Sequence, residues 1–225
     1  MDVRWTPNEL EHAGPEHLNP GYVDGYDRKT GLDVDAEIDL LVGLGLGSDS
    51  TLVDLGAGTG LLARAARDRC RRVVAVDPSP AMLERAKARK VECVQAGFLT
   101  YEHVGDPPGI AYSRNALHHL PDSWKAVALR RIARLLAPGG TLVLRDIVYS
   151  CEPDELDEVL AAWFDAATED PADGWTRAEL EHHVRTEHST FSWLLEPMLE
   201  RAGLRIDDRW YADSRTYARY LCTKP

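Results

Sequence analysis

Glycines at positions 56, 58 and 60 constrain the fold of this chain more than any other feature of its 225 residues. They directly follow residues 51–55, a short apolar run (Thr-Leu-Val-Asp-Leu) of the kind that forms a buried strand. Glycine lets the backbone turn sharply and approach a ligand closely, and residues 61–69 favour a helix that would begin at this turn. The run therefore predicts a strand, a ligand-binding turn and a helix. A tight turn without a ligand is the alternative.

Predicted strands and helices alternate through the middle of the chain. Apolar runs predict four more strands, at residues 72–77, 91–94, 110–113 and 141–144. Apolar residues at helical spacing predict three more helices, from Asp33 to the glycine at 43, at residues 80–90 and at residues 122–136. Strands joined by helices of this length run parallel, because a parallel pair needs a long crossover connection.

The two ends of the chain differ from this middle part. Prolines and glycines interrupt residues 1–32, which we expect to form an irregular arm with at most a short helix. Residues 151–203 are expected to form a helical insertion or lid, with helices at 154–168 and 191–202. Two closely spaced strands follow, 204–210 and 216–222, and so short a connection favours an antiparallel pair. The predicted fold is one α/β domain (1–225): a doubly wound, seven-stranded, mostly parallel sheet with an antiparallel C-terminal hairpin.

Charge and composition narrow the classes of partner. The sequence has 26 Lys and Arg residues against 37 Asp and Glu residues, a formal net charge of −11. This charge repels polyanions, so we expect neither nucleic acid nor a membrane as partner. There is no run of 18 apolar residues and no signal-like N-terminal segment, and the four cysteines lack the paired spacing of a zinc site. These features predict a cytoplasmic protein without a metal centre, and they leave the oligomeric state open.

The spacing of the glycines separates two nucleotide-binding families. A dinucleotide fingerprint, Gly-x-Gly-x-x-Gly, would need glycine at position 61, where this chain has Leu61. Gly-x-Gly-x-Gly preceded by Asp54 instead resembles motif I of the class I S-adenosylmethionine-dependent methyltransferases, and residues 136–142 (Leu-Ala-Pro-Gly-Gly-Thr-Leu) resemble that family's turn before strand five. The resemblance implies a Rossmann-like fold, S-adenosylmethionine as cofactor and methyl transfer to a small molecule. A cofactor-binding module without turnover is the first alternative, and an NAD(P)-dependent oxidoreductase is a weaker one.

The same resemblance implies which residues contact the cofactor. Four residues of the glycine turn would enclose its methionyl part and ribose: Gly56, Ala57, Gly58 and Gly60. Asp54 would help to hold the amino group, and Asp77 would accept hydrogen bonds from the ribose hydroxyls, unless it only caps the following helix. The other expected contacts lie beside the adenine, at the methionyl end and on the arm that could close over the cofactor: Pro78 and Met82, Arg114 and Asn115, and Tyr26.

One position departs from the family's pattern. The family often has an acidic residue after strand three that accepts a hydrogen bond from the adenine amino group, but this chain has Gly97 there. We expect backbone groups of Gly97 and Phe98, with the phenylalanine ring packing nearby, to replace the carboxylate. Loss of one charged hydrogen bond would cost about 1.5–3 kcal/mol of cofactor affinity.

Histidine is the natural general base near neutral pH, and two histidines are candidates for catalysis. His118 follows the segment after strand four that borders the methyl group in this family; a structural hydrogen bond is its alternative role. His188 lies in the insertion, in a stretch that could instead cap the helix from residue 191 through Ser189 or Thr190. His119 is expected to point away, into helix packing. Three tryptophans predict either an aromatic-lined acceptor pocket or packing between insertion helices: Trp163, Trp175 and Trp193.

Overall fold

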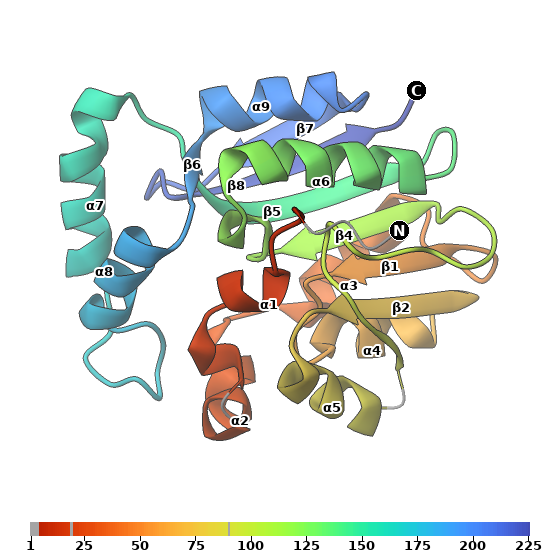
Figure 1. Cartoon of the computed structure of the whole chain (residues 1–225), viewed down its shortest axis with the longest axis horizontal. Coiled ribbons are helices and arrows are strands. Elements are labelled where there is room, and N and C mark those ends of the chain that lie inside the picture. The colour runs from red at the N-terminus through yellow and green to blue at the C-terminus, as the bar shows by residue number, and fades with distance from the viewer. Residues whose placement is uncertain (1–4, 19, 90) are drawn as a thin grey trace.

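A central β-sheet organises the protein, whose computed structural model describes residues 5–18, 20–89 and 91–225 (Figure 1). Within these residues the strand order is β3-β2-β1-β4-β5-β8-β7, with the two-residue strand β6 paired to β5. Strands β1 to β5 pair in parallel, and β8 pairs antiparallel with β5 and β7, so the predicted sheet is confirmed. The bounds are β1 (Thr51–Leu55), β2 (Arg72–Asp77), β3 (Glu92–Gln95), β4 (Ile110–Arg114), β5 (Thr141–Tyr149), β6 (Thr190–Phe191), β7 (Arg205–Tyr211) and β8 (Tyr217–Thr223).

Helices cover both faces of the sheet because the inner strands are apolar on both sides. In β1, Leu52 packs with α3 (Val34–Gly43) and α4 (Leu61–Arg67). The next residue, Val53, points to the opposite face and belongs to the core formed with α6 (Asp122–Leu135) and α9 (Ser192–Arg201). Helix α5 (Pro80–Ala88) packs against β2 and β3. This two-sided burial is what makes a continuous apolar strand a reliable sequence signal.

The N-terminal arm is more helical than predicted. It contains α1 (Glu9–His12), a 3₁₀ helix (Pro15–Leu18) and α2 (Pro20–Lys29). The side chain of Asn8 caps α1 by accepting a hydrogen bond from the backbone N–H of Leu10, and α2 begins at a proline, which the first helical turn tolerates. The arm lies across the carboxyl ends of the strands, where Ser79 Oγ donates a hydrogen bond to the carbonyl of His17 (2.7 Å).

The predicted insertion 151–203 divides into two unlike parts. A short 3₁₀ helix (Pro153–Glu155), α7 (Leu156–Asp165) and α8 (Arg177–Thr186) stand beside the sheet, whereas α9 packs in the same layer as α6 (Figure 1). Helix α8 was not predicted. The prediction that Ser189 or Thr190 caps α9 is wrong, because Thr190 belongs to β6 and the N-cap residue is Phe191. In the described part of the chain, no helix combines the length and the apolar character needed to cross a membrane.

Candidate active site

The glycine turn forms because all three glycines adopt a left-handed backbone. Their φ angles are 73° at Gly56, 54° at Gly58 and 75° at Gly60, values that residues with a side chain rarely adopt. Gly60 also packs closely on α5: a β-carbon there would lie 2.8 Å from that of Ala86. Gly60 is buried and lines neither of the two small cavities beside the turn, so its visible role is to shape the turn, and its contact with the cofactor stays a prediction.

Three cavities surround this turn and the carboxyl ends of the strands. The β4-side cavity has a volume of about 50 Å³ and is lined by Asp54, Gly56, Ala57, Gly58, Arg114 and Asn115, among others. The β2-side cavity, of about 60 Å³, is lined by Gly56, Gly58, Asp77, Pro78, Met82, Gly97 and Phe98, among others. The large cavity, of about 450 Å³, lies beneath α8. The first two cavities therefore bring together every predicted cofactor residue except Gly60.

The β4-side cavity contains polar groups that lack partners. The Asp54 side chain is 3% exposed, and burial followed by the nearby carboxylate of Asp77 raises the pKa of Asp54 to about 7. Asn115 has a φ of 49° although it is not glycine, and its Oδ1 atom is buried without a hydrogen-bond donor among the described residues. The Nε atom of Arg114 is likewise buried without a hydrogen-bond acceptor among the described residues, although Nη2 of the same side chain donates to the carbonyl of Thr30 (3.0 Å). Buried polar groups of this kind are suited to bind a polar ligand.

The carboxylate of Asp77 is fixed at the wall of the β2-side cavity. One oxygen accepts a hydrogen bond from the backbone N–H of Gly58 and the other from that of Ser79, both at 2.8 Å. Burial raises the pKa of Asp77, whereas these two hydrogen bonds oppose the rise. Ser79, and not Asp77, is the N-cap residue of α5. Asp77 therefore connects the glycine turn to the end of β2, with its carboxylate at the cavity.

A carboxylate from the N-terminal arm occupies the space beside Gly97. The Glu9 carboxylate accepts hydrogen bonds from the backbone N–H of Leu99 (3.0 and 3.1 Å) and from Oγ1 of Thr100 (3.1 Å), and Glu9 is only 8% exposed. A β-carbon at position 97 would overlap this carboxylate. The backbone N–H of Gly97 donates to Thr100 Oγ1 (2.9 Å), and the expected role of the Gly97 and Phe98 backbone beside the adenine stays a prediction. Glu9 brings a carboxylate to this position.

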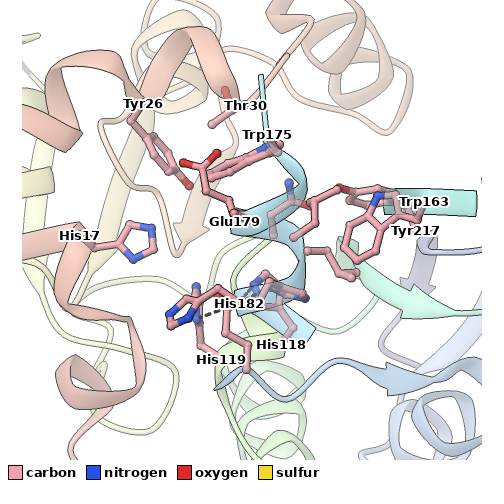
Figure 2. A pocket seen from close by; sticks show the side chains of 16 residues that line it. His17, Tyr26, Thr30, His118, His119, Trp163, Trp175, Glu179, His182 and Tyr217 are labelled. Carbon is pink, nitrogen blue, oxygen red and sulfur yellow. Dashed lines mark ion pairs between the residues drawn. The ribbon is translucent and has the colours of Figure 1, made fainter. Parts of the chain in front are cut away.

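The large cavity lies between the arm and the lid helices. Figure 2 shows Tyr26 of α2 and Thr30, which follows α2, on one side and side chains of α7 and α8 on the other. Trp163 and Trp175 line it together with Tyr217, as an aromatic pocket would require. Trp193 does not: it is 46% exposed and stacks on Phe191, with 5.4 Å between ring centroids.

The structure does not favour His118 as a base. Its Nδ1 is hydrogen-bonded to Asp146, and its Nε2 lies 2.9 Å from Oε2 of Glu187. Burial lowers the pKa of His118, but Asp146 and Glu187 together raise it to about 9. Both ring nitrogens are thus engaged by carboxylates, so neither is free to accept a proton from an acceptor molecule.

The two neighbouring histidines also differ from their predictions. His119 does not point into helix packing: it lines both the large and the β2-side cavities, and its buried Nδ1 has no hydrogen-bond partner among the described residues. Burial, and then His118, lower the pKa of His119 well below its usual value, so the ring is neutral. His188 lines none of the three cavities and packs edge-on against His12 (5.9 Å between centroids), a placement that does not favour the predicted direct role of His188.

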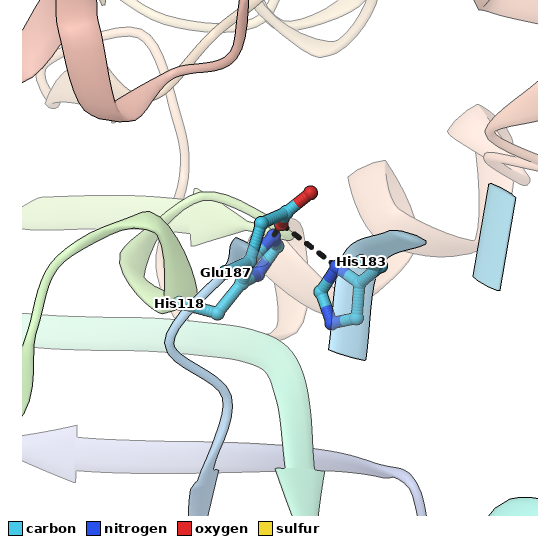
Figure 3. A group of neighbouring side chains, drawn as sticks. All are labelled: His118, His183 and Glu187. Carbon is cyan, nitrogen blue, oxygen red and sulfur yellow. Dashed lines mark ion pairs between the residues drawn. The ribbon is translucent and has the colours of Figure 1, made fainter. Parts of the chain in front are cut away.

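Helix α8 contributes residues that sequence reasoning missed. His183 Nδ1 lies 2.8 Å from the same Glu187 oxygen that contacts His118 (Figure 3). His118, His183 and Glu187 each offer one ligand atom, and the three atoms lie within 4.8 Å of one another, close enough to hold a metal ion. The i, i+4 spacing of His183 and Glu187 was visible in the sequence. Such a spacing brings two side chains together only where the segment is helical, and this helix was not predicted.

The cavities meet at a small set of shared residues. Tyr26 and Asn115 line all three of them, and His17 and His119 line the large and the β2-side cavities. A ligand bound along the glycine turn would therefore face the large cavity at Asn115 and Tyr26. The sequence also offers Tyr22 of the arm as a residue that could close over the cofactor, but its side chain lies outside the described part of the structure.

Comparison with known proteins supports the family predicted from the sequence. Residues 52–140 match the family model of a methyltransferase domain. This match and the relatives that follow support the predicted resemblance to the class I methyltransferases. An uncharacterised methyltransferase of Geobacillus kaustophilus is 30% identical over 131 residues, which are 56% of this chain and 60% of that protein. An uncharacterised methyltransferase of Mycobacterium bovis is 35% identical over 114 residues, 49% of this chain and 55% of that protein.

Solved structures of methyltransferases and of a cyclase share the fold of this chain. The N-methyltransferase NodS of Bradyrhizobium japonicum, in complex with S-adenosyl-L-homocysteine, superposes with a TM-score of 0.64 at 16% identity, covering 97% of this chain and 100% of that one. The cyclase SpnF superposes with a TM-score of 0.62 at 20% identity, covering 85% of this chain and 80% of SpnF. The chain spans only about 60% of the length of the curated relative from Geobacillus kaustophilus. The family and fold predictions are confirmed, and the activity is a separate question.

Proposed function

We propose that this methyltransferase transfers a methyl group from S-adenosylmethionine to a small molecule bound in the large cavity. The observation that carries the proposal is that Tyr26 and Asn115 line all three cavities. A cofactor with its methionyl part in the β4-side cavity and its adenosyl part in the β2-side cavity would present its methyl group at these two residues. The family of the chain and the S-adenosyl-L-homocysteine bound to NodS support this choice of cofactor.

Each end of the proposed cofactor would meet a carboxylate. Asp54 would face the cationic amino group, Asp77 the ribose hydroxyls and Glu9 the adenine amino group, because these are the carboxylates of the two smaller cavities and their surroundings. Glu9 belongs to the arm, so cofactor binding would require the arm to be in place.

The two smaller cavities imply that the arm moves during the reaction cycle. Volumes of about 50 and 60 Å³ are far below the 300–1,000 Å³ typical of ligand sites. Glu9, Ala13, His17 and Tyr26 of the arm all line the β2-side cavity. We therefore propose that the arm opens to admit the cofactor and closes again over it.

The chemistry requires alignment above all. Bound along the glycine turn, S-adenosylmethionine would supply an activated methyl group to an acceptor atom in the large cavity. The products would be a methylated acceptor and S-adenosyl-L-homocysteine, with any acceptor proton released to water. The cofactor carries the activated leaving group, so the protein's main contribution is to hold the two reactants in this geometry and exclude water. The aromatic rings of Trp163, Trp175 and Tyr217 favour an acceptor with a flat apolar body.

Calorimetry and a turnover assay test the proposal separately. We expect S-adenosyl-L-homocysteine to bind with one-to-one stoichiometry and NAD not to bind; Asp77→Asn should weaken binding roughly tenfold or more, because one charged acceptor is lost. Release of S-adenosyl-L-homocysteine from S-adenosylmethionine is then measured over a panel of aromatic hydroxyl, amine and thiol compounds. Cofactor binding without turnover on any member would favour a binding module, and absence of binding would overturn the proposal.

A further inference from the structure

We propose that His118, His183 and Glu187 bind a divalent transition-metal ion, such as Zn²⁺, at the wall of the large cavity. Two imidazoles and one carboxylate are a common donor set for zinc and for non-haem iron. The proposal does not depend on methyl transfer, and the sequence indicated no such centre.

The three ligand atoms converge on one point. In Figure 3 the Glu187 carboxylate lies between the two rings, with Oε2 2.9 Å from His118 Nε2 and 2.8 Å from His183 Nδ1. Ligands of a tetrahedral ion with bonds of about 2.0–2.1 Å lie about 3.3 Å from one another. The two oxygen–nitrogen distances would each need to lengthen by a few tenths of an ångström, and the two ring nitrogens lie within 4.8 Å of each other.

The remaining ring nitrogens are held in the way that metal-binding histidines usually are. His118 Nδ1 is hydrogen-bonded to the buried carboxylate of Asp146, and His183 Nε2 lies 2.8 Å from Oγ of Ser189. Such outer contacts fix the orientation of each ring and raise its strength as a ligand. Asp146 also accepts the backbone N–H of His118 (2.9 Å), so both the ring and the backbone of His118 are anchored.

The charge of the cluster suits a cation. Asp146 and Glu187 bring two carboxylates into a buried region, with side chains only 3% and 16% exposed. Among the described residues, the ion-pair partners of Glu187 are histidines alone, and no lysine or arginine pairs with it. Its Oε2 atom also lacks a hydrogen-bond donor of good geometry. A divalent ion would balance both carboxylates and leave the two imidazoles neutral.

Three protein ligands would leave a coordination position free. All three residues line the large cavity, so the free position faces the space that we assign to the acceptor. On the proposed function, an oxygen, nitrogen or sulfur atom of the acceptor could occupy that position and be held close to the methyl group.

The test measures metal binding directly. Protein treated with a chelator and then freed of it is titrated with Zn²⁺ by calorimetry, and Co²⁺ binding is followed by its visible absorption. We expect one equivalent of Zn²⁺ in the wild type, with at least about tenfold weaker binding in His183→Ala and Glu187→Gln. His182→Ala is the matched control, because His182 lies on the same helix and lines the same cavity but is outside the cluster. It should bind Zn²⁺ like the wild type.

Binding of S-adenosyl-L-homocysteine by every variant separates the metal site from the proposed function. A variant that still binds this compound is folded, so its loss of Zn²⁺ binding supports the site. No stoichiometric Zn²⁺ binding in the wild type, or equal binding in wild type and His183→Ala, would overturn the metal site and leave the proposed function standing. If His183→Ala fails to fold, His183→Gln replaces it in the same comparison.

Discussion

Gly97 and Glu9 come from distant parts of the chain, and the Glu9 carboxylate occupies the space that a side chain at position 97 would need. Position 97 has no room for a side chain because the Glu9 carboxylate lies where the β-carbon would be. We expect Glu9→Ala to weaken binding of S-adenosyl-L-homocysteine roughly 10- to 100-fold, the value of one charged hydrogen bond. Adding Gly97→Asp to Glu9→Ala should restore most of the affinity, whereas Gly97→Asp alone should weaken it, because two carboxylates would then compete for one place.

Calorimetry of the three variants checks this exchange. Glu11→Ala is the control, since Glu11 is an exposed acidic residue of the same short helix. Wild-type affinity in Glu9→Ala would show that the arm carboxylate has no part in cofactor binding.

Asp54 makes the stability of the ligand-free protein depend on pH. Its pKa in the folded state is raised to about 7 by burial and by Asp77, from 3.8 in an unfolded chain. Between these values the folded protein binds a proton that the unfolded chain has lost, so the free energy of unfolding falls as pH rises, by at most about 1.4 kcal/mol per pH unit. Below pH 4 and above pH 7 this contribution is constant.

Asp54→Asn isolates the contribution, because asparagine does not titrate. Urea unfolding at pH 5, 6, 7 and 8 should show the wild type losing stability relative to Asp54→Asn from pH 5 to pH 7, with little further change at pH 8. A constant difference between the two proteins across this range would mean that Asp54 is ionised throughout.

At the level of secondary-structure elements, the sequence predicts those strands and helices that a short, contiguous pattern of residues specifies. The parallel strands were found because each one is a contiguous apolar run, and the residues around the two small cavities were predicted because their motifs resemble those of a methyltransferase family. Helix α8 was missed because few of its residues are apolar, and only Leu180 and His183 of α8 are buried. A capping box of Thr176 and Glu179 marked its start and was the one available signal.

The contacts within the site were missed for a different reason than helix α8. Glu9 and Gly97 form one wall, and His118 and His183 contact one carboxylate, only because the folded chain brings separate segments together. No local pattern encodes such a pair. The arm was predicted as irregular because proline and glycine disfavour helices on average, yet Pro20 stands at a helix start, where proline is tolerated. Local sequence patterns therefore predicted the strands and the glycine turn around the site. Contacts between distant segments, which such patterns do not encode, determined which side chains meet there.

At the scale of the whole molecule, the arm joins the two halves of the proposed site. Near its end, Lys29 forms an ion pair with Glu179 of α8 and lies 5.2 Å from the centre of the Trp175 ring. Two residues earlier, Asp27 is hydrogen-bonded to Thr59 of the glycine turn and paired with Arg89 beyond α5. The arm thus spans the lid helices and the cofactor turn, so closure over the cofactor and closure over the acceptor would be one movement.

This link predicts how the cofactor leaves. Lys29→Ala removes the contact between the arm and α8, a partly exposed pair worth at most about 1 kcal/mol, so S-adenosyl-L-homocysteine should dissociate up to about fivefold faster. Association should change less, because the open form already admits the compound. Stopped-flow tryptophan fluorescence measures both rates, with Arg28→Ala, at an exposed neighbouring position, as the control. Equal dissociation rates in wild type and Lys29→Ala would show that α8 does not hold the arm closed, and closure over the two parts of the site would then be independent.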